Sequence, residues 1–118
     1  MNLKSDLDFV SMESETNLTK LVEDLQLKTS AAKTFLRYAL ANALLFDRKH
    51  TDYGPTNISG FGTFGVIVRM NDKHERLKTL FAKKKRRKAV NESVEDTLRD
   101  ISNYAIIACI VEKGEWPA

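Results

Sequence analysis

The chain has 118 residues, a length that suits one domain with a single hydrophobic core. Hydrophobic residues make up 42% and charged residues 30% of it, with few glycines and prolines, which favours a helix-rich globular protein over a disordered chain. No apolar run approaches the roughly 20 residues of a membrane helix, the N-terminus is too acidic for a signal peptide, and a single cysteine rules out an internal disulfide, so we expect a cytoplasmic protein.

The net charge of +3 is mild, and much of it comes from one basic run, KKKRRK, at residues 83–88. Such a run is typical of a solvated helix end or loop, and it also occurs in proteins that bind nucleic acid. We favour the solvated segment and keep binding to nucleic acid as an alternative.

The first half of the chain is predicted to hold two helices. Residues 1–13 carry no clear period and form an N-terminal arm or a short element. From about 15–27, leucine and valine recur at helical spacing, with Asn17 as a candidate N-cap. Ser30 is a candidate cap for the second helix, AAKTFLRYALANALLFDRK, whose broad apolar face suits a central core helix.

The second half is predicted to hold a long loop and two further helices. The stretch HTDYGPTNISGFGTFG, residues 50–65, gathers four of the five glycines, so a glycine-rich loop is expected between helices two and three. Helix three covers roughly 63–82 and helix four about 92–112, where Cys109 is expected to be buried in an apolar run. The fold predicted for 1–118 is therefore a single all-α domain, a bundle of four to five helices.

Three carboxylates in helix four are four residues apart: Glu92, Asp96 and Asp100. At about 100° per residue they lie within roughly 80° of one another, so they share one stripe of the helix. Ile107 and Ile110 continue this stripe toward the C-terminus. A face that runs into the core is enclosed at Asp96 and Asp100, and enclosed carboxylates require hydrogen bonds, cationic partners or a metal ion.

One interpretation of this stripe is a magnesium site. Mg²⁺ takes carboxylate oxygens together with water and substrate phosphates, and Asp72 on helix three would face the stripe across a groove. The other interpretation needs no metal. Glu92 and Asp96 are favourable near a helix N-terminus, and Asp100 would pair with Arg69 or Arg76.

Basic residues flank the acidic stripe and would neutralise phosphate oxygens. The candidates outside the basic run are Lys49, His50, Arg69, Lys73 and Arg76. Each of them taken alone is more typical of an exposed cation, and only their position around the stripe indicates phosphate binding.

Three strings taken in order resemble a known family. They are KHTDYGPTNISGFG, VRMNDKHERL and NESVEDTLRDISNYAII. Their order and spacing resemble the nucleotide modification associated domain family 1, found largely in bacteriophages and their hosts, over about residues 46–113. That family is similar to the MazG-like all-α nucleoside triphosphate pyrophosphatases, although the upstream E-E-x-x-E cluster of those enzymes is missing here.

The resemblance implies roles for individual residues. Metal binding, and catalysis in an enzyme, would fall to Asp72, Glu92, Asp96 and Asp100. The residues placed around the nucleotide would be Lys49, Asp52, Tyr53, Asn57, Arg69, Lys73 and Arg76.

Two functions follow as hypotheses. The first is an Mg²⁺-dependent pyrophosphohydrolase that releases monophosphate and pyrophosphate from a (deoxy)nucleoside triphosphate. The alternative is a non-catalytic nucleotide-binding phage protein that sequesters a signalling nucleotide or accompanies nucleotide modification. In either case we expect a homo-oligomer without membrane contact, in the host cytoplasm if the protein is phage-encoded.

Overall fold

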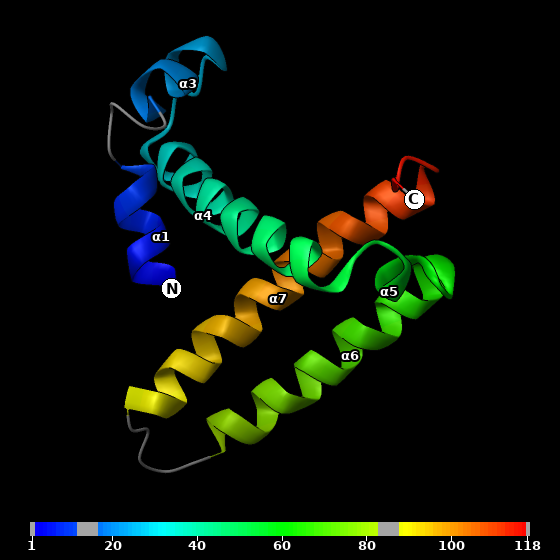
Figure 1. Cartoon of the computed structure of the whole chain (residues 1–118). Helices are drawn as coiled ribbons and strands as arrows, with labels where there is room; N and C mark the ends of the chain where they lie inside the picture. The colour runs from blue at the N-terminus through cyan, green and yellow to red at the C-terminus, as the bar shows by residue number, and fades with distance from the viewer. Residues whose placement is uncertain (1, 12–16, 83–87, 118) are drawn as a thin grey trace. The chain divides into compact units, whose positions relative to one another are not determined.

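The computed structural model describes residues 2–11, 17–82 and 88–117, and every regular element in these ranges is a helix (Figure 1). The helices are α1 (Leu3–Val10), α3 (Leu18–Asp24), α4 (Ser30–Tyr53), α5 (Thr56–Ser59), α6 (Gly62–Phe81) and α7 (Lys88–Glu112). The all-α class is confirmed, with six described helices where four to five were predicted. None of these helices is long and apolar enough to cross a membrane. Residues 83–87 of the basic run lie outside the described residues.

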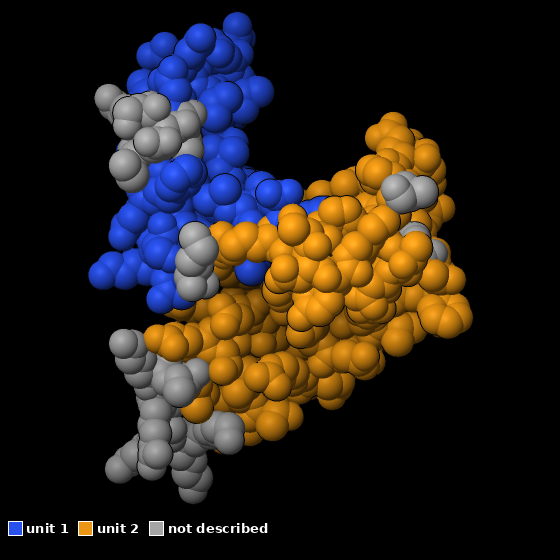
Figure 2. All heavy atoms as spheres, in the orientation of Figure 1, with its two compact units in different colours: residues 1–47 blue, residues 48–118 orange. Residues whose placement is uncertain are grey.

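The chain divides into two compact units, residues 1–47 and residues 48–118 (Figure 2). In the first unit, the expected arm is a short element after all, because α1 begins with a capping box. Asn2 Oδ1 accepts the backbone N–H of Ser5, and Ser5 Oγ accepts the backbone N–H of Asn2, both at 3.0 Å. The core of this unit consists of Leu7, Val10 and Ala41, against which four leucines pack: Leu3, Leu18, Leu40 and Leu44.

The two caps expected in the first unit differ from those observed. Asn17 precedes α3 with a left-handed φ of 48° and makes no side-chain capping hydrogen bond. Helix α3 also ends earlier than predicted, because Gln26 takes a left-handed φ of 56° and the N–H of Leu27 bonds back to the carbonyl of Val22. Thr29, one residue before Ser30, caps α4 by accepting the backbone N–H of Ala32 at 3.0 Å.

The long glycine-rich loop predicted over residues 50–65 is wrong, because most of that stretch is helical. Helix α4 continues to Tyr53 and stops at Gly54, which adopts a positive φ of +75° that glycine reaches without strain. The short helix α5 follows at once, and α6 begins at Gly62, also at positive φ (+63°). Gly54, Gly60 and Gly62 therefore lie where consecutive helices end or begin, whereas Gly65 lies within α6.

Helices α6 and α7 form the body of the second unit, where they lie antiparallel and side by side (Figure 1). Their predicted spans are confirmed within one residue for α6, and α7 begins four residues earlier than expected. The buried apolar side chains of the pair are Val66, Leu80, Val94 and Ile107. Cys109, expected to be buried, is exposed on α7.

Candidate functional site

Asp100 is the buried member of the acidic stripe on α7, with 8% of its surface exposed. Its two carboxylate oxygens have separate cationic partners. Lys49 Nζ donates to Oδ1 at 2.5 Å, and Lys73 Nζ lies 3.1 Å from Oδ2. Since a carboxylate out of water requires hydrogen bonds or cations, this lysine–aspartate cluster of Lys49, Lys73 and Asp100 explains how Asp100 is tolerated there.

The phase of α6 brings Lys73 to this position. Val66, Met70, Lys73, Leu77 and Leu80 follow one another at spacings of three or four residues, so they lie on one stripe of the helix. Its two ends, Val66 and Leu80, are buried in the second unit. Lys73 thus stands in the middle of an otherwise apolar stripe. Lys49 comes from the last turns of α4, a distant part of the sequence.

The cluster keeps an excess of positive charge and remains reachable from solvent. The side chains of Lys49 and Lys73 are 47% and 32% exposed, whereas that of Asp100 is 10% exposed. Two ammonium groups around one carboxylate leave a net charge of about +1, and each ammonium has three N–H donors. An anion with several oxygens, such as a phosphate, matches this arrangement.

Further cationic groups lie along the same face of α6. At about 100° per residue, Arg69, Lys73 and Arg76 fall within roughly 60° of one another, and all three were predicted to contact phosphate. Arg69 Nη2 donates to the backbone carbonyl of Asn57 at 2.5 Å and lies 3.3 Å from Asn57 Oδ1. Arg76 is exposed. The helix therefore presents a ridge of three cations, one of which is tied to α5.

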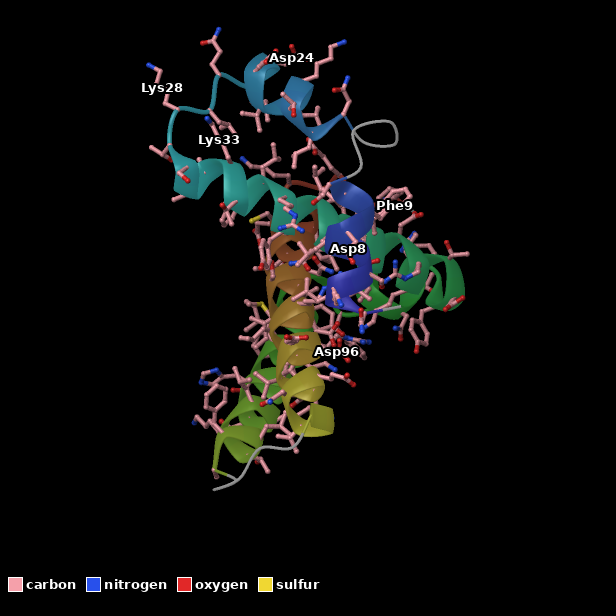
Figure 3. All side chains as sticks on the ribbon, turned by 90° about the vertical axis from the view of Figure 1, so that its left-hand side faces the viewer. Asp8, Phe9, Asp24, Lys28, Lys33 and Asp96 are labelled. Carbon is pink, nitrogen blue, oxygen red and sulfur yellow. The ribbon has the colours of Figure 1, made fainter. Side chains whose placement is uncertain are left out.

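The remaining predicted residues are exposed. Asp52 and Tyr53 lie at the end of α4, Asp72 on α6, and Glu92 and Asp96 on α7, where Figure 3 labels Asp96. The enclosure predicted for the stripe therefore holds at Asp100 and fails at Asp96.

The carboxylates of the stripe were also predicted to hold Mg²⁺. Within the described part of the chain, no three His, Cys, Asp or Glu side chains are grouped so that they could hold a metal. Asp100 in addition has each of its oxygens on a lysine. The magnesium site stays a prediction.

Sequence reasoning missed the other buried polar groups of α7. They are Thr97, Arg99 and Asn103, at 3%, 4% and 9% exposure. Thr97 Oγ1 donates to the carbonyl of Ser93 at 2.6 Å. The helical spacing could have predicted the burial of Asn103, since Asn103 lies on the same stripe of α7 as Asp100 and Ile107.

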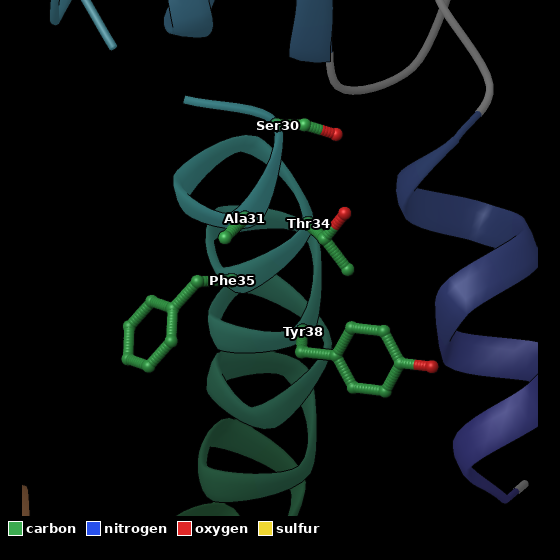
Figure 4. A pocket seen from close by; sticks show the side chains of 5 residues that line it. All are labelled: Ser30, Ala31, Thr34, Phe35 and Tyr38. Atoms are coloured by element: carbon green, nitrogen blue, oxygen red, sulfur yellow. The ribbon is translucent and has the colours of Figure 1, made fainter. Parts of the chain in front are cut away.

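A second feature lies in the first unit, whereas all of the predicted site residues belong to the second unit. An open depression is lined by side chains from the start of α4 (Figure 4), namely Ser30, Ala31, Thr34, Phe35 and Tyr38. Phe35 and Tyr38 point to different sides of the helix and are 76% and 43% exposed. A depression formed by a single helix does not enclose a ligand, and no predicted site residue lines it.

Comparison with known proteins connects the second unit to one family. The sequence model of nucleotide modification associated domain 1 matches residues 49–111, which is more than half of the chain. This range includes the lysine–aspartate cluster, the cationic ridge of α6 and Asn57. No curated protein and no solved structure matches the chain.

Proposed function

The chain belongs to the nucleotide modification associated domain 1 family, and from this premise we propose that it binds a nucleotide through its phosphates at Lys49 and Lys73. One observation carries the proposal: two partly exposed ammonium groups converge on a single buried carboxylate. Asp100 fixes the positions of both lysines before any ligand arrives, and such preorganisation lowers the cost of binding an anion.

The surroundings of the cluster support the same ligand class. Arg69 and Arg76 extend the positive charge along α6, so they would contact further phosphate groups of the same nucleotide. Exposed aromatic rings stand in the same unit, where they would stack on a base: Tyr53 at 68% exposure, Phe61 at 87% and Phe64 at 74%.

A second candidate is hydrolysis of the bound nucleotide to monophosphate and pyrophosphate with Mg²⁺, in the manner of MazG-like enzymes. The observation in its favour is Asp96, an exposed carboxylate one turn before Asp100 on the same stripe. We place binding without turnover first, because both oxygens of Asp100 are held by lysines. Sequestration of a signalling nucleotide is the form of this function that needs no turnover.

The proposal is tested by calorimetric titration with the common ribo- and deoxyribonucleoside triphosphates, cyclic mononucleotides and inorganic pyrophosphate, with and without Mg²⁺. Chromatography of each mixture separates intact ligand from products. Binding followed by recovery of intact nucleotide supports the first candidate, whereas monophosphate with pyrophosphate supports the second.

Lys49→Met and Lys73→Met identify the site, because methionine keeps much of the side-chain volume and removes the charge. Each should weaken binding at least tenfold, which corresponds to about 1.4 kcal/mol, a typical value for one charged contact to phosphate. Lys78→Met is the matched control, since Lys78 lies on the same helix, is 61% exposed and pairs with Glu75. Equal affinities for all three variants, or no ligand for the native protein, would contradict the proposal.

A further inference from the structure

The C-terminal tail, residues 113–117, contacts the junction between α4 and α5. Trp116 Nε1 donates a hydrogen bond to the carbonyl of Pro55 at 3.1 Å. The indole also meets the His50 ring edge to face, with centroids 5.4 Å apart and an interplanar angle of 89°. Trp116 is therefore attached to both sides of the turn that ends α4.

The end of α7 directs the tail to this junction. Gly114 takes a left-handed φ of +72°, its N–H bonds to the carbonyl of Val111, and the N–H of Glu115 bonds to the carbonyl of Ile110. This is the pattern by which a glycine ends a helix and reverses the chain. The reversal leaves Trp116, two residues later, against Pro55 and His50.

The residues that Trp116 contacts are close in sequence to residues that bind, or hold in place, the proposed phosphate-binding side chains. Pro55 also accepts the N–H of Ile58 at 3.2 Å, so its carbonyl anchors the first turn of α5. Asn57 lies in that turn and accepts the guanidinium of Arg69. On the other side, His50 directly follows Lys49, which binds Asp100. The indole of Trp116 thus contacts both the end of α4, which carries Lys49, and the residue before α5, the helix whose Asn57 binds Arg69.

We propose that Trp116 is a positioning residue of the phosphate site, acting by fixing the α4–α5 junction and, through Asn57, the guanidinium of Arg69. This inference rests on the proposed function and adds to it a segment outside the matched range of the family, residues 49–111. Because Trp116 is the only tryptophan of the chain, its emission reports on the junction directly.

The test uses the full chain with inorganic pyrophosphate, which carries phosphate groups without a base. Trp116→Phe keeps an aromatic ring beside His50 and removes the N–H donor to Pro55. It should weaken pyrophosphate binding about fivefold while the unfolding midpoint stays close to that of the native chain, since loss of preorganisation acts on affinity. Glu115→Gln, a change in the exposed neighbouring residue, is the control and should leave the affinity unchanged.

A second pair of measurements separates positioning from a general structural role. In an Arg69→Gln background, Trp116→Phe should cause less than a twofold further loss, because the group through which it acts is already gone. In the native chain, saturating pyrophosphate should shift the emission of Trp116, a readout that does not depend on how the variants fold.

The outcomes are distinguishable. If the native chain binds no pyrophosphate, the proposed phosphate site and this inference are both overturned. If it binds and Trp116→Phe binds equally well, or the emission does not change, or the full loss persists in the Arg69→Gln background, only the role of Trp116 is overturned.

Discussion

Replacing Asp100 with asparagine should destabilise the second unit by about 2 kcal/mol. The substitution keeps the shape and removes the charge that binds two ammonium groups, at 2.5 and 3.1 Å. A hydrogen bond between charged groups contributes about 1.5–3 kcal/mol when it is shielded from water. The lysines are 47% and 32% exposed, so solvent screening reduces each contact to about 1 kcal/mol.

Urea unfolding followed by circular dichroism measures this loss. Asp96→Asn is the matched control, because Asp96 lies one turn earlier on the same helix and is exposed, so its replacement should change the free energy of unfolding by less than about 0.5 kcal/mol. The difference between the two variants should also shrink as salt is added, because the lysines are partly solvated. Equal stability of the two variants would refute the account of Asp100 as the anchor of both lysines.

Four further outcomes are expected. Asn2→Ala removes the capping box of α1 and should lower the free energy of unfolding by about 1 kcal/mol, measured by calorimetry. Gly114→Ala should cost about 1 kcal/mol in unfolding experiments through its φ of +72° alone, because an added Cβ would meet no atom within 4 Å. The affinity for pyrophosphate should fall steadily as ionic strength rises, and an affinity independent of salt would contradict a cationic site. Light scattering should give a mass above the 13.4 kDa of one chain, because Leu98 and Ile106 on α7 are about half exposed, and a monomer would remove the predicted homo-oligomer.

Helical periodicity was sufficient to predict the long helices but not the junction between α4 and α6. Apolar spacing located α6 and α7 because the two helices pack together, burying Val66 and Leu80 of α6 and Val94 and Ile107 of α7. In residues 50–65 the glycines suggested a loop, and composition cannot distinguish a loop from several short helical turns separated by glycine. The observed positive φ at Gly54 and Gly62 shows that these residues mark helix ends, which only the three-dimensional path of the chain reveals.

The three residues of the lysine–aspartate cluster were all among the predicted site residues, but the ion pairs between them were not predicted. Sequence spacing identified Asp100 as enclosed, and it is. Pairing with Arg69 or Arg76 was expected in the absence of a metal, whereas the partners are Lys49 and Lys73. Lys49 was out of reach of such reasoning, because a contact across 51 residues depends on how α4 meets α7.

The pairing of Lys73, in contrast, could have been predicted from its position on its own helix. Lys73 occupies the position between Met70 and Leu77 on a stripe that is apolar at both ends. A lysine there must either extend to solvent or meet a carboxylate, since an unpaired buried ammonium is costly. The carboxylates predicted to be enclosed on the facing helix were Asp96 and Asp100, and of these two Asp100 is buried. Arg69 and Arg76 lie off the centre of this stripe, by roughly 40° and 60° from Lys73. Arg69 instead donates to Asn57 on α5, and Arg76 is exposed, so neither arginine replaces a lysine at Asp100.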